Sequence, residues 1–179
     1  FHLDVESAAD EEVILHVSAD QRYQLSVDGV EVGYGPDRGD FQHWGVASYR
    51  LRLGQGRHRL EALVWWLAKG QPAAQMTIRG GFLVAADGQA ERFNTGVAAW
   101  QVERLEHAFT LDEKGTANHC GYAGWAWIVD AAAWAAPRER CAPVEVGGRF
   151  HDNPYGEMRR GWRLEPSILP EQLRELLPA

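Results

Sequence analysis

The stretch that decides the fold of this chain reads Gln21-Arg22-Tyr23-Gln24-Leu25-Ser26-Val27-Asp28-Gly29-Val30-Glu31-Val32-Gly33-Tyr34-Gly35-Pro36. From Tyr23 to Val27, apolar and polar residues alternate with the period of two that a half-buried β-strand shows. Asp28-Gly29 then offers two residues that tolerate a positive φ, as a tight hairpin turn requires. A returning strand begins at Val30, and Gly35-Pro36 ends it. The stretch therefore predicts a β-hairpin.

Further strands are expected on both sides of this hairpin, because similar short apolar runs recur there. They cover residues 1–5, 13–19, 48–53, 58–66, 74–78, 82–86, 100–103 and 143–146. Across its 179 residues the chain has 19 Gly and 8 Pro, many of which separate these runs. Short strands divided by turn residues are typical of an all-β chain. We expect mostly antiparallel strands in two layers packed face to face.

The second half of the chain has a less regular pattern. Residues 104–128 show no clean period and predict a long ordered loop, of a kind that often contacts a partner. The Ala-rich run 130–136 predicts a short helix that Pro137 ends. Residues 170–177 predict a second short helix with Pro170 at its start. We expect this helix and the aromatic residues of the long loop to form a docking surface.

Composition and charge exclude several classes of function. The formal net charge is −7 at pH 7 and no long basic run is present, which argues against nucleic-acid binding. No apolar run approaches the about 18 residues that a membrane span needs. The two cysteines, Cys120 and Cys141, are expected to be reduced thiols, with a single bridge as the alternative. Reduced thiols suit a cytoplasmic location, which we favour.

The chain shows no convincing catalytic or metal-binding motif. Glycosidic hydrolysis usually needs two carboxyl groups, and only the neighbours Asp37 with Asp40 and Asp112 with Glu113 could converge. We interpret these acids as solvated loop residues or strand caps. The possible ligands His107, His119, Cys120 and His151 do not have a recognised zinc spacing. A structural Ca²⁺ at residues 37–40 or at Asp87-Gly88 is the more natural alternative, and we expect no other cofactor.

A sugar-binding surface is the remaining candidate site. It needs an exposed aromatic face for the apolar side of a pyranose and nearby polar groups for the hydroxyls. One predicted loop provides this set, in the residues Tyr34, Asp37, Arg38, Asp40, His43 and Trp44. The eight Trp of the chain are mainly expected in the core, but some are candidates for sugar platforms. The competing interpretation is that this loop packs on another domain.

Several short motifs resemble the N-terminal β-sandwich module of bacterial α-L-rhamnosidases. They are Arg22-Tyr23-x-Leu25, Asp28-Gly29, Gly35-Pro36-x-Arg38-Gly39-Asp40 and Trp65. Later segments, Gly124-Trp125, Asp130-x3-Trp134 and residues 164–170, resemble the part that closes the module and leads out of it. Asp28 departs from the family, where Asn is more frequent in this turn.

The resemblance implies a galactose-binding-like jelly roll that is an accessory part of a large bacterial glycoside hydrolase. In such enzymes the catalytic carboxylates belong to a separate helical barrel, so we expect this chain to be non-catalytic and to pack on that domain. The parent would act on rhamnose-terminated glycosides, and rhamnose-containing carbohydrate is a possible partner. Alternatives are a free-standing carbohydrate-binding module and a structural interaction domain without a ligand.

The expected domain organisation follows from the same resemblance. Residues 1–150 would form the jelly roll, with the loop-rich insertion at 104–128. Residues 151–179 would form a linker and a short helix that lead to a missing domain. The chain begins at Phe1 without an initiator Met, so we expect it to be a piece of a longer protein.

Overall fold

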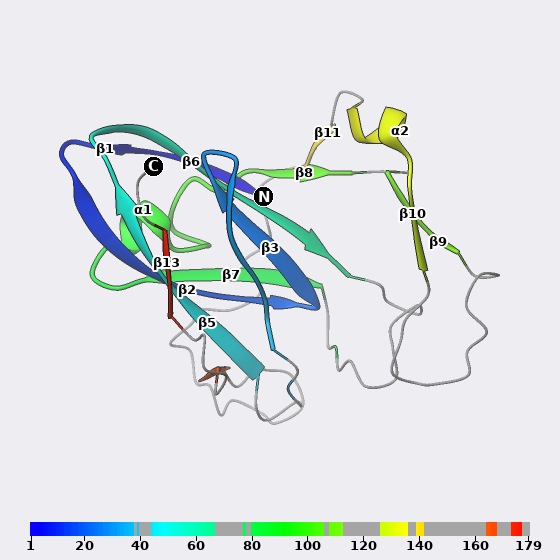
Figure 1. The fold of residues 1–179 in the computed structure, drawn as a ribbon, viewed down its shortest axis with the longest axis horizontal. Coiled ribbons are helices and arrows are strands. Elements are labelled where there is room, and N and C mark those ends of the chain that lie inside the picture. Colours follow the sequence, from blue (N-terminus) through cyan, green and yellow to red (C-terminus); the bar gives the residue numbers. More distant parts are fainter. Residues whose placement is uncertain are drawn as a thin grey trace.

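Two β-sheets packed face to face form the body of the protein (Figure 1). The computed structural model describes residues 1–37, 39, 44–66, 77, 80–105, 108–112, 126–135, 139–141, 164–167 and 173–176. A four-stranded antiparallel sheet has the order β1 (His2–Ser7), β6 (Gly56–Trp65), β3 (Arg22–Val27) and β4 (Val30–Gly35). A five-stranded sheet has the order β12 (Leu164–Pro166), β5 (Trp44–Leu53), β2 (Glu11–Asp20) and β7 (Gly81–Ala86), and β13 (Leu173–Leu176) also pairs with β5. The all-β sandwich that the sequence predicts is confirmed.

The core lies between the two sheets and is built from the inward-facing residues of each strand. Alternation along β3 buries Tyr23, Leu25 and Val27, and β2 contributes a matching set to the same cluster. At its centre, Tyr23 meets Tyr49 of β5, with the two hydroxyl oxygens 2.8 Å apart. The Tyr23 hydroxyl also lies 3.4 Å from the Val17 carbonyl oxygen, to which it donates. The buried hydroxyls thus have partners that link the sheets, as buried polar groups require.

Strand β4 passes close to these two tyrosines because it carries glycine where it faces them. A Cβ at Gly33 would lie 2.6 Å from Tyr49 Cε1, and a Cβ at Gly35 would lie 2.9 Å from the Tyr23 hydroxyl oxygen. A register shift between Leu25 and Ser26 marks a β-bulge in the pairing of β3 with β4. Residues Gly33-Tyr34-Gly35 can therefore lie directly over the core only because positions 33 and 35 have no side chain.

We predict that Gly33→Ala lowers the free energy of unfolding by about 1–3 kcal/mol, the usual cost of overpacking a core. Gly54→Ala is the matched control, because its Cβ would come no closer than 3.8 Å to Asp10 Oδ1. Urea unfolding of the two variants measures the difference. An unchanged transition for Gly33→Ala would mean that the Tyr49 ring moves aside freely.

The turn between β3 and β4 is also tied to β6. Asp28 and Gly29 have φ values of 51° and 78°, so the predicted positive-φ turn is confirmed. Asp28 Oδ1 accepts the Arg59 backbone N–H at 2.7 Å, and Oδ2 lies 2.7 Å from His58 Nδ1. The hydrogen bond to Asp28, together with one to the Gly54 carbonyl oxygen, raises the pKa of His58. A carboxylate at position 28, rather than an amide, thus favours the protonated imidazole.

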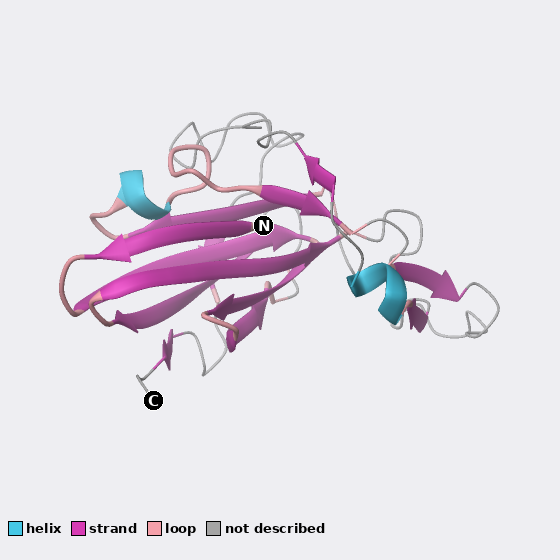
Figure 2. Cartoon of the chain, turned by 90° about the horizontal axis from the view of Figure 1, so that it is seen from above, coloured by secondary structure: helices cyan, strands magenta, loops and turns pink. Residues whose placement is uncertain are grey.

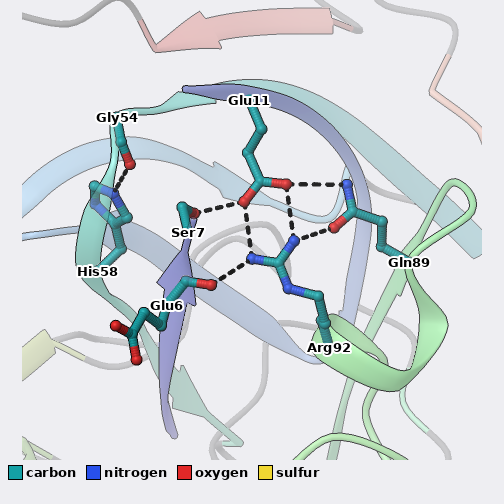
Figure 3. A network of polar contacts seen from close by, with 7 residues as sticks. All are labelled: Glu6, Ser7, Glu11, Gly54, His58, Gln89 and Arg92. Carbon is teal, nitrogen blue, oxygen red and sulfur yellow. Dashed lines mark hydrogen bonds and ion pairs between the residues drawn. The ribbon is translucent and has the colours of Figure 1, made fainter. Parts of the chain in front are cut away.

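A second polar network fastens helix α1 (Ala90–Phe93) to the connection between β1 and β2, which leads from one sheet to the other (Figure 3). The Arg92 guanidinium donates to both carboxylate oxygens of Glu11, each at 2.8 Å, and to the Glu6 carbonyl oxygen at 2.9 Å. Buried Ser7 also donates to Glu11, at 2.5 Å. These bonds, that of Arg92 above all, lower the pKa of Glu11 to about 2. The ionised carboxylate therefore stabilises the fold.

The lowered pKa of Glu11 predicts how the stability of the fold depends on pH. Because the folded pKa lies below the ordinary value of 4.5, the contribution of Glu11 is complete above pH 4.5 and is lost as the pH falls toward about 2. We expect Glu11→Gln to lower stability by about 1–2 kcal/mol at neutral pH. The difference from the unsubstituted chain should shrink in acid. Thermal unfolding at several pH values measures it, with exposed Glu91→Gln as control, and a difference independent of pH would contradict the assignment.

The segments after the core strands add smaller elements at one end of the sandwich. Strand β8 (Val102–Arg104) pairs with β11 (Glu139–Cys141), and β9 (Phe109–Asp112) pairs with β10 (Ala126–Val129). Helix α2 (Ala131–Ala135) follows, and Asp130 Oδ1 accepts the N–H groups of Ala132 and Ala133. Figures 1 and 2 show β9, β10 and α2 projecting from the body as an arm.

In the second half of the chain, the structure changes two of the expected elements and confirms a third. Part of the supposed loop at 104–128 forms the strands β9 and β10, while the short helix at 130–136 is confirmed by α2. The helix expected at 170–177 is wrong for residues 173–176, which form β13 parallel to β5. A helix this short is marginal by itself, so hydrogen bonding to an open strand edge prevails.

Other expectations fall largely or wholly on residues that the structure does not describe. The strand at 143–146 and Cys120 lie outside the described residues, as does the strand at 74–78 apart from Thr77.

Among the described residues, no helix combines the length and apolar character needed to cross a membrane.

Candidate functional site

A hollow of about 390 Å³ opens on the outer face of the four-stranded sheet, where β3, β4 and β6 meet. Its side chains include the aromatic rings of Tyr34 and Trp65 and the polar groups of Arg22, Gln24 and Asp37. The volume is near the lower end of the range of small-molecule pockets. The hollow is therefore the candidate site in the described part of the chain.

Strand register explains how these side chains come to share one face. Tyr23 points into the core, so its neighbours Arg22 and Gln24 point outward. Gln24 lies directly opposite Tyr34 of β4, and Arg22 lies opposite Trp65 of β6. Tyr34 is 65% exposed, Trp65 is half-buried, and Arg22 and Gln24 are exposed. The hollow thus has an aromatic ring on each side and polar groups of β3 between them.

Asp37, from the segment that follows β4, completes the lining, and distant residues hold it there. Ser167, which is 7% exposed, donates its hydroxyl to Asp37 Oδ2. The Ser167 N–H also donates to the Val46 carbonyl oxygen at 3.0 Å, which fixes Ser167 to β5. A Cβ at Gly45 would lie 3.2 Å from the Asp37 carbonyl oxygen, so the backbones pack closely here. The wall is therefore braced by the segment after β12.

The predicted site residues do not all lie in this hollow. Tyr34 and Asp37 line it, whereas Arg38, Asp40 and His43 lie outside the described residues. The prediction that Trp44 offers an exposed face is wrong: it is 3% exposed, and its indole N–H donates to the Ala19 carbonyl oxygen at 3.1 Å. Trp44 is the first residue of β5 rather than a loop residue, and it is buried on the same side of that strand as Val46.

We predict that Trp44→Ala destabilises the fold by about 3–5 kcal/mol, as truncation of a buried Trp usually does. Trp134→Ala is the control, because Trp134 is 37% exposed on α2. Chemical denaturation followed by circular dichroism distinguishes them. A Trp44→Ala chain of undiminished stability would contradict its structural role.

Sequence reasoning missed Arg22, Gln24 and Trp65 as site residues. The alternation in β3 already places Arg22 and Gln24 on the face opposite the core. Their neighbours from β4 and β6 follow only from the strand order, which is not a local property of the sequence. Trp65 was singled out by the resemblance but not linked to a site.

The outer face of the other sheet carries a Ser-His-Asp arrangement. His16 Nδ1 lies 2.8 Å from Ser48 Oγ, and its Nε2 lies 3.0 Å from Asp87 Oδ1. Acyl transfer also needs N–H donors beside the nucleophile to stabilise an oxyanion. Around Ser48 the backbone of β5 is paired with β2 on one side and β13 on the other. Its N–H groups lie in the sheet plane, so we assign these residues a structural cross-strand contact.

The acids considered for catalysis and metal binding are only partly described. Asp37 is described and Asp40 is not, and the same holds for Asp112 and Glu113. No cluster of three or more His, Cys, Asp or Glu suited to a metal ion is found within the described ranges. The structural Ca²⁺ stays a prediction.

Comparison with known proteins gives a partial structural likeness. A scan against models of protein families found no match, and a search of curated proteins found none either. A solved structure of a GH78 family rhamnosidase of Bacillus sp. GL1 matches with a TM-score of 0.49 and 20% sequence identity. The match covers 78% of this chain and 16% of that chain, so this chain spans a small part of the enzyme's length.

Proposed function

We propose that this chain is a non-catalytic accessory module of a larger α-L-rhamnosidase-like glycoside hydrolase and packs on its catalytic domain. The observation that carries the proposal is the role of the motif residues in the sandwich. Tyr23 is buried at the centre of the core, and Gly35 leaves room for its hydroxyl. Asp28-Gly29 makes the positive-φ turn. Four of the residues that resemble the family module, Tyr23, Asp28, Gly29 and Gly35, thus serve the fold of the sandwich.

The composition of the hollow supports a non-catalytic role. Glycosidases place two carboxyl groups roughly 5–9.5 Å apart across the bond that they cleave. The carboxylate of the described lining is that of Asp37, which accepts a hydrogen bond from Ser167. The other charged group of this lining is the Arg22 guanidinium, which stays protonated and cannot serve as the second catalytic acid or base. This lining therefore lacks the acid pair of a glycosidase.

Exposed apolar residues on the arm support packing against another domain. Val129 at the end of β10 is 56% exposed, and Trp134 of α2 is 37% exposed. They lie five residues apart in sequence, on the part that projects from the sandwich (Figure 2). Apolar surface of this kind is a usual component of interfaces between domains. The parent catalytic domain is the partner that the proposal assigns to it.

A free-standing carbohydrate-binding module is the second candidate, and the hollow is the observation that favours it. The two candidates differ in what surrounds the chain in its natural protein. An antibody raised against this chain should capture, from source cells, a much longer polypeptide that cleaves an aryl α-L-rhamnoside. Capture of a polypeptide no longer than this chain, without such activity, would exclude the accessory-module proposal.

The purified chain itself should not release the aglycone from an aryl α-L-rhamnoside. The reason is the missing carboxylate pair in the described lining. Chromogenic assays from acid to neutral pH measure this, with Asp37→Ala as the comparison. Turnover that survives removal of contaminating glycosidases and disappears in Asp37→Ala would overturn the prediction.

A further inference from the structure

We infer that the hollow between Tyr34 and Trp65 is a binding site for a neutral pyranose, either a monosaccharide or the end of a glycan. This inference deepens the proposed function and rests on it only for the choice of rhamnose as the first sugar to test. The ligand class follows from the side chains themselves. Of the six residues expected to bind sugar, Tyr34 and Asp37 line this site, Trp44 is buried elsewhere, and the other three lie outside the described residues.

The aromatic residues are spaced for a sugar ring. Tyr34 and Trp65 belong to β4 and β6, which flank β3 on either side. Two inter-strand spacings separate these two strands by about 10 Å. The register staggers them by two residues, because Tyr34 lies opposite Gln24 and Trp65 lies opposite Arg22. A pyranose ring fits this gap with its apolar face against one of the rings.

Polar groups lie between the aromatic residues, where the hydroxyls of a sugar would come. Gln24 donates from its amide to Glu31, which orients the group and leaves its carbonyl oxygen as an acceptor. The Arg22 guanidinium has five N–H donors and can serve a hydroxyl in addition to another partner. Asp37 supplies an acceptor of opposite charge on the same lining. A cation and an anion together favour a neutral ligand rich in hydroxyl groups over a charged one.

The backbone segments that carry both aromatic walls are held in place before any ligand arrives. The Tyr34 backbone lies between Gly33 and Gly35, and its carbonyl oxygen lies 3.5 Å from the Tyr49 hydroxyl oxygen. The Trp65 carbonyl oxygen accepts the Gln21 N–H at 3.4 Å, so the end of β6 is also paired. A site that is ordered beforehand loses less entropy on binding. A small open site still binds weakly, with Kd on the order of mM.

The experiment is a calorimetric or NMR titration of the full chain with L-rhamnose, D-galactose, D-glucose and D-galacturonate. We expect saturable binding of at least one neutral sugar. Tyr34→Ala and Trp65→Ala should each raise Kd roughly tenfold, and Gln24→Ala should raise it less. Val30→Ala is the matched control on the same strand, because Val30 is 55% exposed and outside the hollow lining. Circular dichroism verifies that each variant is folded. If Trp65→Ala unfolds, Tyr34→Ala still tests the site, because Tyr34 is exposed and its side chain is not part of the core.

The outcomes separate this inference from the proposed function. Binding of a neutral sugar that weakens in Tyr34→Ala supports the site, whichever sugar it is. Preference for galacturonate overturns the neutral ligand class. Absence of saturable binding by any sugar, or binding unchanged in folded Tyr34→Ala, overturns the site. None of these results decides the parentage, which the antibody capture decides separately.

Discussion

The contact between the hydroxyl groups of Tyr23 and Tyr49 is the constraint on which the rest of the structure depends. It places two polar groups between the sheets, where each needs a partner, and the backbone carbonyl oxygens of Val17 and Tyr34 complete the set. Strand β4 approaches the rings only because Gly33 and Gly35 carry no side chain. Tyr34, between them, directs its ring outward. The same packing therefore closes the core and builds one wall of the hollow.

Local features of the sequence were enough to predict the sandwich. The alternation in β2, β3 and β5 and the turn at Asp28-Gly29 are properties of neighbouring residues, and they recur in the structure. The end of the chain behaved differently, since residues 173–176 have a helical apolar pattern but form a strand on β5. Their conformation is decided by an open edge formed more than a hundred residues earlier, which no local pattern contains.

The site was harder to predict than the fold, and for a related reason. Tyr34 and Asp37 are predictable as site residues because they lie close together in the sequence, at the end of β4 and in the segment that follows it. Arg22 and Trp65 become neighbours only when β3 pairs with β6, so their juxtaposition needs the strand order. Trp44 was misplaced because the start of β5 precedes the clear alternation, and a residue assigned to the loop was in fact buried in the strand.

Strands β12 and β13 cover the edge of β5, which could otherwise pair with another molecule. Without these short strands, β5 would form one border of its sheet, with a row of N–H and C=O groups open to any other extended chain. Bare borders of this kind recruit strands from other molecules, which leads to swapped dimers and aggregates. Strands β12 and β13 follow the other strands of the sandwich in sequence, so they leave the ribosome after them. During synthesis there is therefore an interval in which this edge of β5 is uncovered.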